Sequence, residues 1–433
     1  MISPSDTVNA RLESWIRVEP ASDFPVQNLP FGVFKPAGRE ARIGVAIGDL
    51  ILDCRTLAES GMVDGCCERE LLQAPLLNPL LAAGRSVWTP LRERLSLLLR
   101  VDGDPRLRDS GADNFLVAAA TVEMRVPMEI GDYVDFYSSL EHATNLGRLF
   151  RPNAEALLPN WRWLPVGYHG RSASIVIDGT PVRRPSGQRK APDLAAPDFG
   201  PTRRLDIELE MGFVAGPGNR FGEPISVNSA RDHIFGLVLV NDWSARDIQA
   251  WEYQPLGPFL GKSFATTISP WVVTLDALEP FRVEGPPQAP APLAYLRVED
   301  PWAYDVRLAV DLQTSKMRER GIPAREISAT NFANMYWNVA QQLAHATANG
   351  ALVRPGDLFA SGTISGSAPG TQGSLIELTW NGERPLELPD RENRGFLQDG
   401  DEVALRGWCD KAGARRIGFG LARGTIEPAL DPR

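Results

Sequence analysis

The stretch LDIELEMGFV (205–214) places two glutamates, Glu208 and Glu210, within one predicted strand. Acidic and apolar residues alternate along it, a pattern typical of a half-buried strand, and the apolar set is Leu205, Ile207, Leu209 and Met211. Residues two apart on a strand face the same side, so the two carboxylates lie close and repel unless water or a cation separates them. The stretch therefore fits either a solvated acidic face or a cation site.

The surrounding sequence predicts a mostly antiparallel β architecture. GLVLV (236–240) is a continuous apolar run, typical of a strand buried on both faces, and it ends at Asn241-Asp242. Loops rich in proline and glycine punctuate this region at 183–201, 215–224 and 283–295. SLIELTW (374–380) is predicted as a further strand, and residues 331–350 as a helix that Gly350 ends.

A chain of 433 residues is too long for one ordinary core, so we expect two domains. Residues 29–54 carry short alternating stretches and turn glycines, which indicate a small β-rich unit, whereas 70–100 has helical spacing. The boundary is placed near TVEMRVPM, which gives an N-terminal domain at 1–125 and a catalytic domain at 126–433.

The composition of the chain indicates which kinds of binding partner and which cellular compartment to expect. A net charge of −9 argues against nucleic acid and anionic membranes as main partners. We find no run of about 18 apolar residues, and the first residues lack the plan of a signal peptide. The cysteines are scattered, which favours a reducing cytoplasm; they are Cys54, Cys66, Cys67 and Cys409.

The segment DYVDFYSSLEHATN (132–145) joins a predicted strand to a predicted helix. Asp135 and Tyr137 alternate as on a strand, while Ser138 and Glu141 have the spacing of a capping box. His142 then falls in the first turns, where the helix dipole favours the neutral imidazole. It is either a structural histidine or a general base. Glu377 is likewise either a solvent-facing residue or the carboxylate that orients a histidine.

A second constellation follows the buried strand, in NDWSARDIQAWEY (241–253). On a helix, Arg246, Gln249 and Tyr253 share one face. Asp242 either caps that helix or joins the basic and amide groups in a site for an anionic oxygen. Lys262 lies in GPFLGKS, which lacks the spacing of a phosphate-binding loop, and no helix follows GPGNRFG (216–222), so nucleotide binding is not predicted.

Taken together, these segments resemble the fumarylacetoacetase (fumarylacetoacetate hydrolase) family in order and spacing over most of residues 130–420. The matching stretches are DFYSS..HATN (135–145), LLPNW..LPVGYHGR (157–171), GTPVRRPSGQ (179–188), LDIELEMGF (205–213), GPGNRFGEP (216–224), NDWSARDIQ.WEY.PLGPFLGKSF (241–264) and RPGDLFASGTISGS (354–367). The resemblance implies a mainly β fold with some α, in which a small SH3-like N-terminal barrel precedes a larger mixed β-roll. It also implies a homodimer.

The resemblance also implies the roles of individual residues. His142 is expected to be the general base and Glu377 its orienting partner, with an oxyanion group formed by Arg246, Gln249 and Lys262. The expected metal ligands are Asp135, Glu208, Glu210 and Asp242, with Lys262 and Thr266 at a second ion seat. The expected substrate contacts are Tyr137, Arg151, Tyr168, Gln249, Tyr253 and Thr363. The sequence departs from the family pattern at Ala265, where glycine is expected, and at Leu140-Glu141.

The implied reaction is hydrolysis of 4-fumarylacetoacetate to fumarate and acetoacetate, the last step of tyrosine and phenylalanine breakdown. Four carboxylates without matched cysteine or histidine ligands suit a hard divalent cation, Ca²⁺ and/or Mg²⁺, and the carboxylate count favours Ca²⁺. The substrate would be a small dicarboxylate. The alternatives are another activity of the superfamily, such as acylpyruvate hydrolysis or decarboxylation of a 2-oxo-diacid, and a non-catalytic metal-binding protein.

Overall fold

The computed structural model describes residues 4–191, 193, 195–300 and 302–430. Its N-terminal part contains a five-stranded antiparallel sheet in the order β4-β3-β2-β1-β5. The strands are β1 (Phe31–Lys35), β2 (Arg42–Ile47), β3 (Leu50–Asp53), β4 (Leu116–Ala118) and β5 (Glu123–Arg125). The helices are α1 (Cys54–Glu59), α2 (Arg69–Gln73), α3 (Asn78–Ala82), α4 (Arg85–Leu99) and α5 (Arg106–Asp109). The predicted helical character of residues 70–100 is confirmed.

The larger part is built on an eight-stranded mixed sheet in the order β7-β6-β22-β13-β14-β16-β8, with β17 also paired to β14. The run GLVLV lies inside β14, every residue of which is buried, as its apolar sequence predicts. The strands are β6 (Tyr133–Phe136), β7 (Gly167–His169), β8 (Ile175–Ile177), β13 (Leu209–Ala215), β14 (Ile234–Asp242), β16 (Thr266–Ile268), β17 (Val273–Thr274) and β22 (Leu358–Ala360).

A second sheet, in the order β21-β20-β25-β26-β9, packs against the first through a shared core. Its strands are β9 (Val182–Arg183), β20 (Arg307–Gln313), β21 (Arg325–Asn331), β25 (Glu402–Cys409) and β26 (Ile417–Glu427). Short pairs complete the fold: β10 (Ser186–Arg189) with β11 (Asp198–Pro201), β12 (Leu205–Asp206) with β15 (Ser244–Ala245), β18 (Arg282–Val283) with β19 (Ala303–Tyr304), and β23 (Leu386–Leu388) with β24 (Glu392–Arg394).

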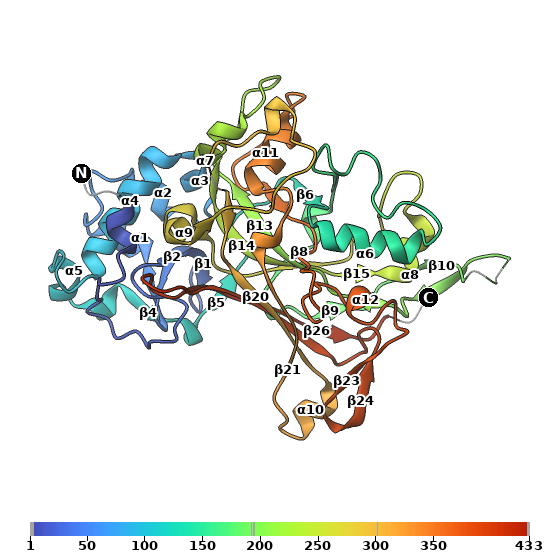
Figure 1. Cartoon of the computed structure of the whole chain (residues 1–433). Coiled ribbons are helices and arrows are strands. Elements are labelled where there is room, and N and C mark those ends of the chain that lie inside the picture. Colours follow the sequence, from blue (N-terminus) through green and yellow to red (C-terminus); the bar gives the residue numbers. More distant parts are fainter. Residues whose placement is uncertain (1–3, 192, 194, 301, 431–433) are drawn as a thin grey trace.

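The remaining helices surround these sheets, and three of them, α6, α8 and α12, lie on the same side of the molecule in Figure 1. They are α6 (Leu140–Phe150), α7 (Ala230–His233), α8 (Arg246–Glu252), α9 (Leu275–Leu278), α10 (Ser315–Glu319), α11 (Val339–Thr347) and α12 (Leu375–Leu378). A mainly β fold, with a small N-terminal sheet and a larger mixed sheet, agrees with the prediction. No helix of the described residues is long and apolar enough to cross a membrane.

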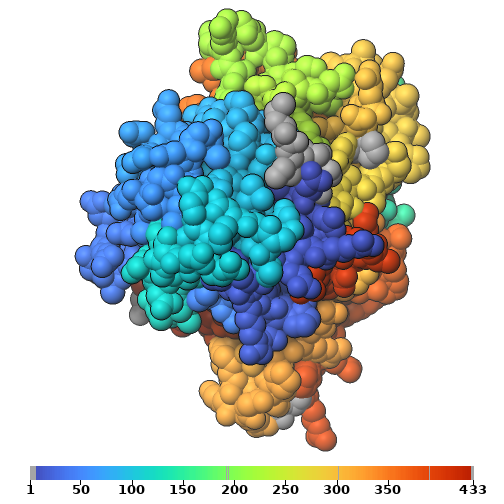
Figure 2. Space-filling view, turned by 90° about the vertical axis from the view of Figure 1, so that its left-hand side faces the viewer, coloured from blue at the N-terminus to red at the C-terminus, as the bar shows by residue number. Residues whose placement is uncertain are grey.

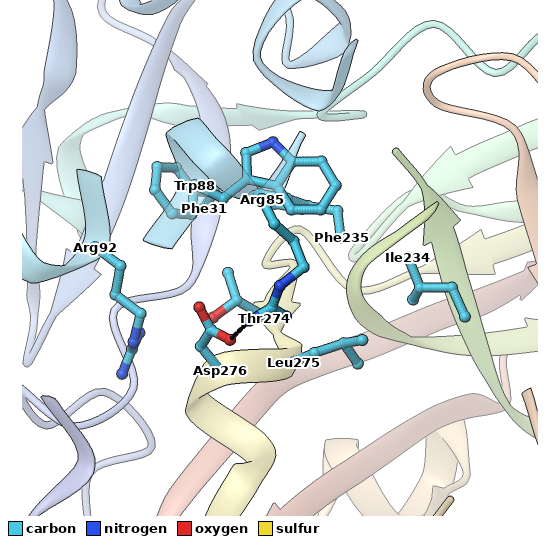
Figure 3. A pocket seen from close by; sticks show the side chains of 9 residues that line it. All are labelled: Phe31, Arg85, Trp88, Arg92, Ile234, Phe235, Thr274, Leu275 and Asp276. Atoms are coloured by element: carbon cyan, nitrogen blue, oxygen red, sulfur yellow. Dashed lines mark hydrogen bonds and ion pairs between the residues drawn. The ribbon is translucent and has the colours of Figure 1, made fainter. Parts of the chain in front are cut away.

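The N-terminal part packs closely on the larger part, as the blue and cyan surface of Figure 2 shows. The ring of Phe235 from β14 lies 5.0 Å from Trp88 and 5.5 Å from Phe31, both edge-on. Arg85 donates to the carboxylate of Asp276 at 3.1 Å, across the same boundary (Figure 3). The cavity among these residues measures about 10 Å³, which leaves room for one water at most. The packing among these residues therefore leaves no room for a substrate at this point of the boundary.

The structure corrects the prediction for SLIELTW, because Leu375–Leu378 forms the single helical turn α12 and not a strand. The carboxylate of Asp206 accepts hydrogen bonds from the backbone N–H groups of Leu375 and Ile376, which stabilises the start of that turn. Alternation over a few residues cannot distinguish a strand from one buried helical turn. A tertiary contact with Asp206 therefore determines the conformation of the segment that carries Glu377.

The helix predicted at 331–350 is shorter than expected. Asn331 ends β21, and α11 begins only after Asn338, which forms a capping box with Gln341. Phe332–Asn334 forms a short 3₁₀ helix, and the buried residues 335–337 separate it from α11, so the helical spacing does not extend the α-helix. Gly350, at φ 82°, follows the helix as predicted.

Two further local predictions are wrong by small margins. The cap of α6 is Ser139, whose hydroxyl accepts from the N–H of His142 at 3.3 Å, and not Ser138 with Glu141. Asp242 does not cap α8, because that helix begins after Ala245 without a side-chain cap. Residues 205–214 form β12 and β13 with a break between them, and all ten are buried, so the acidic side of this stretch faces no solvent.

Candidate functional site: a buried carboxylate cluster beside a histidine

Four carboxyl groups converge because the large sheet brings their strands together. Asp135 on β6, Glu210 on β13 and Asp242 at the end of β14 are buried, and so is Glu208 just before β13. β22 pairs with β6 on one side and with β13 on the other, and β13 pairs with β14. Carboxylate oxygens of Asp135, Glu208 and Asp242 lie within 4.8 Å of one another.

Two oxygens of this cluster are left without partners. The Oδ1 atom of Asp135 and the Oε1 atom of Glu210 are buried and accept no hydrogen bond from any described residue. Burial raises the pKa of both carboxyls well above its usual range, and the neighbouring carboxylates raise it further. An unpartnered buried carboxylate oxygen is costly, and a hard divalent cation bound by oxygen would satisfy it. The residues present therefore fit the predicted cation.

Lys262 supplies positive charge at one edge of the cluster. Its Nζ atom lies 2.8 Å from Oδ2 of Asp242 and also contacts Glu208. Burial alone would lower the pKa of this amine, but the Asp242 and Glu208 carboxylates raise it above its usual value. For the carboxyl group of Glu208, burial alone would raise the pKa, but Lys262 and Arg246 lower it to about 2. Glu208 is therefore ionised at neutral pH, and Lys262 is charged.

Two hydroxyl groups complete the surroundings of Asp242. Thr266 on β16 donates to its Oδ1 atom at 2.7 Å, and Tyr168 on β7 donates to its Oδ2 atom at 3.2 Å. Ala265, the residue found where the family pattern has glycine, is buried immediately before Thr266. Thr266 thus lies next to the carboxylate cluster, where the resemblance places a second ion seat.

The raised pKa values of Asp135 and Glu210 predict how cation binding depends on pH. The cation-free folded protein holds protons on these groups that the unfolded chain releases above about pH 4. These bound protons stabilise the folded state relative to the unfolded chain. That stabilisation is complete below the pKa of the unfolded chain and is lost as the pH rises through the higher pKa of the folded state. A cation requires the ionised groups, so the Tm increase produced by saturating Ca²⁺ should grow from about pH 5.5 to about pH 8. Calorimetric melting checks this, and an increase of equal size at both pH values would contradict it.

His142 lies in the first turn of α6, with its ring buried and its Nδ1 atom 2.6 Å from Oε2 of Glu377. Burial alone would raise the pKa of Glu377, but the His142 ring and hydrogen bonds from neighbouring side chains lower it. The carboxylate is therefore ionised and accepts the Nδ1 proton, which leaves Nε2 as the basic nitrogen. Three side chains besides His142 donate to Glu377, namely Asn145, Ser365 and Ser374.

Arg246 begins α8 and holds a fixed position between two carboxylates. Its Nε atom donates to Asp206 at 2.7 Å, and one terminal nitrogen lies 2.7 Å from Oε1 of Glu208 and 3.2 Å from Oε1 of Gln249. Its other terminal nitrogen, Nη2, is buried and has no acceptor among the described side chains and backbone. A buried, charged donor without a partner suits an anionic oxygen supplied by a ligand.

These groups line one cavity of about 520 Å³, a volume suited to a small organic acid. Its walls include the predicted base, metal ligands and oxyanion donors His142, Asp135, Glu208, Arg246, Gln249 and Lys262. They also include the predicted substrate contacts Tyr137, Arg151, Tyr168, Tyr253 and Thr363. Nε of Arg151 and Oγ1 of Thr363 are further buried polar atoms without a partner in the described structure. The Tyr137 ring stands edge-on to His142 at 5.3 Å. Glu210 and Glu377 lie behind this wall, beside or bonded to residues that form it. Asp242, which accepts from Thr266, lines an adjoining pocket that shares Tyr168 and Lys262 with this cavity.

Sequence reasoning missed Asp206, which is fully buried and contacts both Arg246 and the start of α12. The signal was present, because Asp206 precedes Glu208 and Glu210 at the same alternating spacing. It also missed Asn145, Ser365 and Ser374 around Glu377, three short polar residues that nothing in the sequence distinguishes from loop residues.

Comparison with known proteins places the chain in a family. The family model described as fumarylacetoacetate (FAA) hydrolase C-terminal matches residues 133–427, and fumarylacetoacetase N-terminal matches residues 27–127. The chain is 50% identical over 424 residues to the fumarylacetoacetase of Homo sapiens, covering 97% of this chain and 100% of that protein. It is also 50% identical over 425 residues to that of Arabidopsis thaliana, covering 97% and 99%.

A solved structure, the fumarylacetoacetate hydrolase from psychrophilic Exiguobacterium antarcticum, shares the fold with a TM-score of 0.51. The two sequences are 17% identical, and the match covers 92% of this chain and 99% of that one. The two family models, and relatives that are 50% identical over 97% of the chain, agree on the family. The chain belongs to the fumarylacetoacetase family of hydrolases.

Proposed function

We propose that this protein hydrolyses the carbon–carbon bond of 4-fumarylacetoacetate, which gives fumarate and acetoacetate. One observation carries the proposal: His142, held by the buried Glu377, borders the same cavity as a carboxylate cluster with unpartnered oxygens. The fumarylacetoacetases of Homo sapiens and Arabidopsis thaliana, each 50% identical to this chain, support the choice of substrate. The reaction would be the last step of tyrosine and phenylalanine breakdown.

In the proposed mechanism, Nε2 of His142 removes a proton from water, and the hydroxide adds to the carbonyl carbon of the fumaroyl half. Glu377 holds Nδ1–H and stabilises the imidazolium that forms. Negative charge then develops on the former carbonyl oxygen. The donors available to it are Nη2 of Arg246, the side-chain amide of Gln249 and the ammonium group of Lys262. As the oxygen re-forms its double bond, the carbon–carbon bond breaks, and the imidazolium returns its proton to the acetoacetate carbon.

The cation site has a separate role. Asp135, Glu208, Glu210 and Asp242 would hold the ion, with Thr266 and Lys262 beside Asp242. A divalent cation bound there would polarise a carbonyl oxygen of the diketone and neutralise charge on the departing half. The number of carboxylates favours Ca²⁺, while Mg²⁺, which usually retains several waters, is the alternative. Lys262 keeps part of the cluster neutralised and so limits the repulsion among the carboxylates.

Substrate recognition would use the polar groups at the wall of the cavity. Arg151 offers an unpartnered Nε–H, and Thr363 an unpartnered hydroxyl, so each can donate to a carboxylate of the substrate. Tyr137, Tyr168 and Tyr253 line the same cavity, and their hydroxyl groups suit a dicarboxylate. Apolar residues such as Leu146 and Val166 on the remaining wall contact the carbon chain.

A direct comparison of substrates distinguishes this activity from the acylpyruvate hydrolysis and the 2-oxo-diacid decarboxylation of the wider superfamily. We expect kcat/KM for 4-fumarylacetoacetate to exceed that for an acylpyruvate by at least about a hundredfold, because the shorter substrate leaves buried donors such as Arg151 and Thr363 unpaired. Steady-state assays of both compounds on the same enzyme sample measure the ratio. A higher kcat/KM for the acylpyruvate would assign the enzyme to the other activity.

The proposal extends to the compartment, the oligomeric state and the domain boundary. The protein is proposed to act in the cytoplasm as a homodimer, with the catalytic domain at 126–433 and the N-terminal domain at 1–125. Large apolar side chains at the mouth of the cavity, Phe150, Leu158 and Leu256, are exposed in the single chain, which supports association. A monomer in sedimentation velocity at micromolar concentration would contradict the dimer.

A further inference from the structure

Asp206, at the end of β12, connects the two halves of the proposed catalytic apparatus. Its side chain is fully buried and accepts four hydrogen bonds. Oδ1 accepts from the N–H groups of Ile207 at 2.8 Å and Leu375 at 2.7 Å. Oδ2 accepts from the N–H of Ile376 at 3.0 Å and from Nε of Arg246 at 2.7 Å. All four distances are in the normal range, and a carboxylate accepts up to about four hydrogen bonds.

Two of these donors determine the position of Glu377. The N–H groups of Leu375 and Ile376 open the single turn α12, and Glu377 is the next residue. Ser374 precedes the turn, but its side chain does not cap the helix, because its hydroxyl donates to Glu377 at 2.7 Å. Asp206, 169 residues earlier in the chain than Leu375, supplies the cap instead. A turn this short has little stability of its own, so this contact sets where Glu377 meets His142.

A third donor determines the position of Arg246. Its Nε–H bond to Asp206 leaves one terminal nitrogen facing Glu208 and Gln249, and the other, Nη2, without a partner. Without Asp206 the guanidinium would have one anchoring carboxylate in place of two, and it could rotate about Glu208. The free Nη2 would then no longer hold the position in which it can meet the substrate oxygen.

We propose that Asp206 is a positioning residue for catalysis, which fixes the base-orienting Glu377 and the oxyanion donor Arg246 relative to each other. The proposal rests on the function proposed above, since it concerns the roles assigned there to His142, Glu377 and Arg246. Asp206 itself does not line the cavity. It acts on the reaction through the two residues that it holds, so its loss should lower kcat more than it raises KM.

Replacement by asparagine is the sharpest test, because it keeps the shape of the side chain but cannot accept all four hydrogen bonds. All four partners are donors, two on each oxygen. An asparagine amide offers one acceptor oxygen and one donor nitrogen, so either orientation places an NH₂ group against two donors. One orientation therefore loses the bonds from Ile207 and Leu375, and the other loses the bonds from Ile376 and Arg246.

A matched control is Asp401→Asn. Asp401 is also fully buried, pairs with Arg394 at 2.8 and 2.9 Å, and accepts from the N–H of Gln398 at 2.8 Å. Arg394 ends β24, Gln398 and Asp401 lie between β24 and β25, and none of the three lines the cavity. Both variants lose a buried ion pair, so both should lower Tm, but only Asp206→Asn should alter the chemistry.

We expect Asp206→Asn to lower kcat by about thirtyfold or more with KM within about threefold, and Asp401→Asn to keep kcat within about twofold. In a Glu377→Gln background, Asp206→Asn should cost clearly less than it does alone, because one of its two targets is already impaired. Ca²⁺ affinity, measured by calorimetry, should stay within about threefold in both aspartate variants. These results together would support the positioning role.

Other outcomes would overturn it. If Asp206→Asn lowers Tm like Asp401→Asn and keeps kcat within about twofold, Asp206 is structural only. Fully multiplicative losses with Glu377→Gln would likewise exclude action through Glu377. If Asp206→Asn does not fold, Asp206→Glu, which keeps the charge and displaces it by one methylene, is measured in the same way, and failure of both to fold assigns Asp206 to folding. Failure of the proposed function is recognised separately, by a normal kcat in His142→Ala.

Discussion

His142→Ala is expected to lower kcat by at least about a hundredfold while divalent-cation binding stays intact. The ring is buried, its Nδ1 atom is held by Glu377, and its Nε2 atom is the base available at the cavity. A hundredfold loss corresponds to about 2.7 kcal/mol of barrier. Alanine cannot accept the proton of water, and the ionised Glu377 behind it stays too far back to replace the imidazole. Steady-state kinetics and Ca²⁺ calorimetry on the same sample measure both parts.

His345→Ala is the matched control for this loss. His345 is a half-buried histidine on α11 that bonds the hydroxyl of Tyr295 at 3.0 Å and does not line the cavity. Its removal should leave kcat within about twofold. A near-normal rate in His142→Ala would remove the general base from the mechanism, and it would favour another route to hydroxide.

Removal of the divalent cation by a chelator should abolish hydrolysis, with a fall of at least about a thousandfold, and added Ca²⁺ or Mg²⁺ should restore it. Asp135, Glu208, Glu210 and Asp242 are buried together, and the nearby charges of Lys262 and Arg246 cannot neutralise all of them because Arg246 also pairs with Asp206. Without the ion, burial raises the pKa of Asp135 and Glu210 and so favours their neutral forms, and no cation would be present to polarise a carbonyl.

The control for that experiment is the same chelator saturated with Ca²⁺ beforehand, which should leave the rate unchanged. Intact folding of the metal-free protein, followed by circular dichroism, separates loss of chemistry from unfolding. Full activity in protein shown by elemental analysis to contain no divalent ion would exclude the cation from the reaction.

The sequence predicts the elements that depend on strong apolar patterns. The buried strand at 236–240 follows from an unbroken apolar run, and the helices between 70 and 100 follow from their spacing. Predictions failed where tertiary contacts determine local structure. Residues 374–380 alternate like a strand, yet Asp206 caps a helical turn there. Residues 332–336 have helical spacing, yet the capping box at Asn338 begins the helix later.

The candidate site could be predicted only in part from residue patterns. Pattern alone brings Asp135 close to His142, because a short strand and a helix start adjoin, but it leaves open whether Glu208 and Glu210 face solvent. Nothing local connects Glu377 to His142, 235 residues away. The pattern left Glu377 as either a solvent-facing residue or a carboxylate that orients a histidine, and the resemblance to a family supplied His142 as its partner. Asp206 stayed unnoticed because an aspartate beside two glutamates is indistinguishable from a solvated face until burial is known.

The most direct test of the central claim is a crystal structure of the protein soaked with Mn²⁺, with anomalous differences measured to locate the ion. The account predicts one strong peak at about 2.0–2.6 Å from carboxylate oxygens of Asp135, Glu208, Glu210 and Asp242, on the cavity that His142 borders. A fully occupied peak elsewhere, with these four carboxylates bonded only to protein and water, would contradict it.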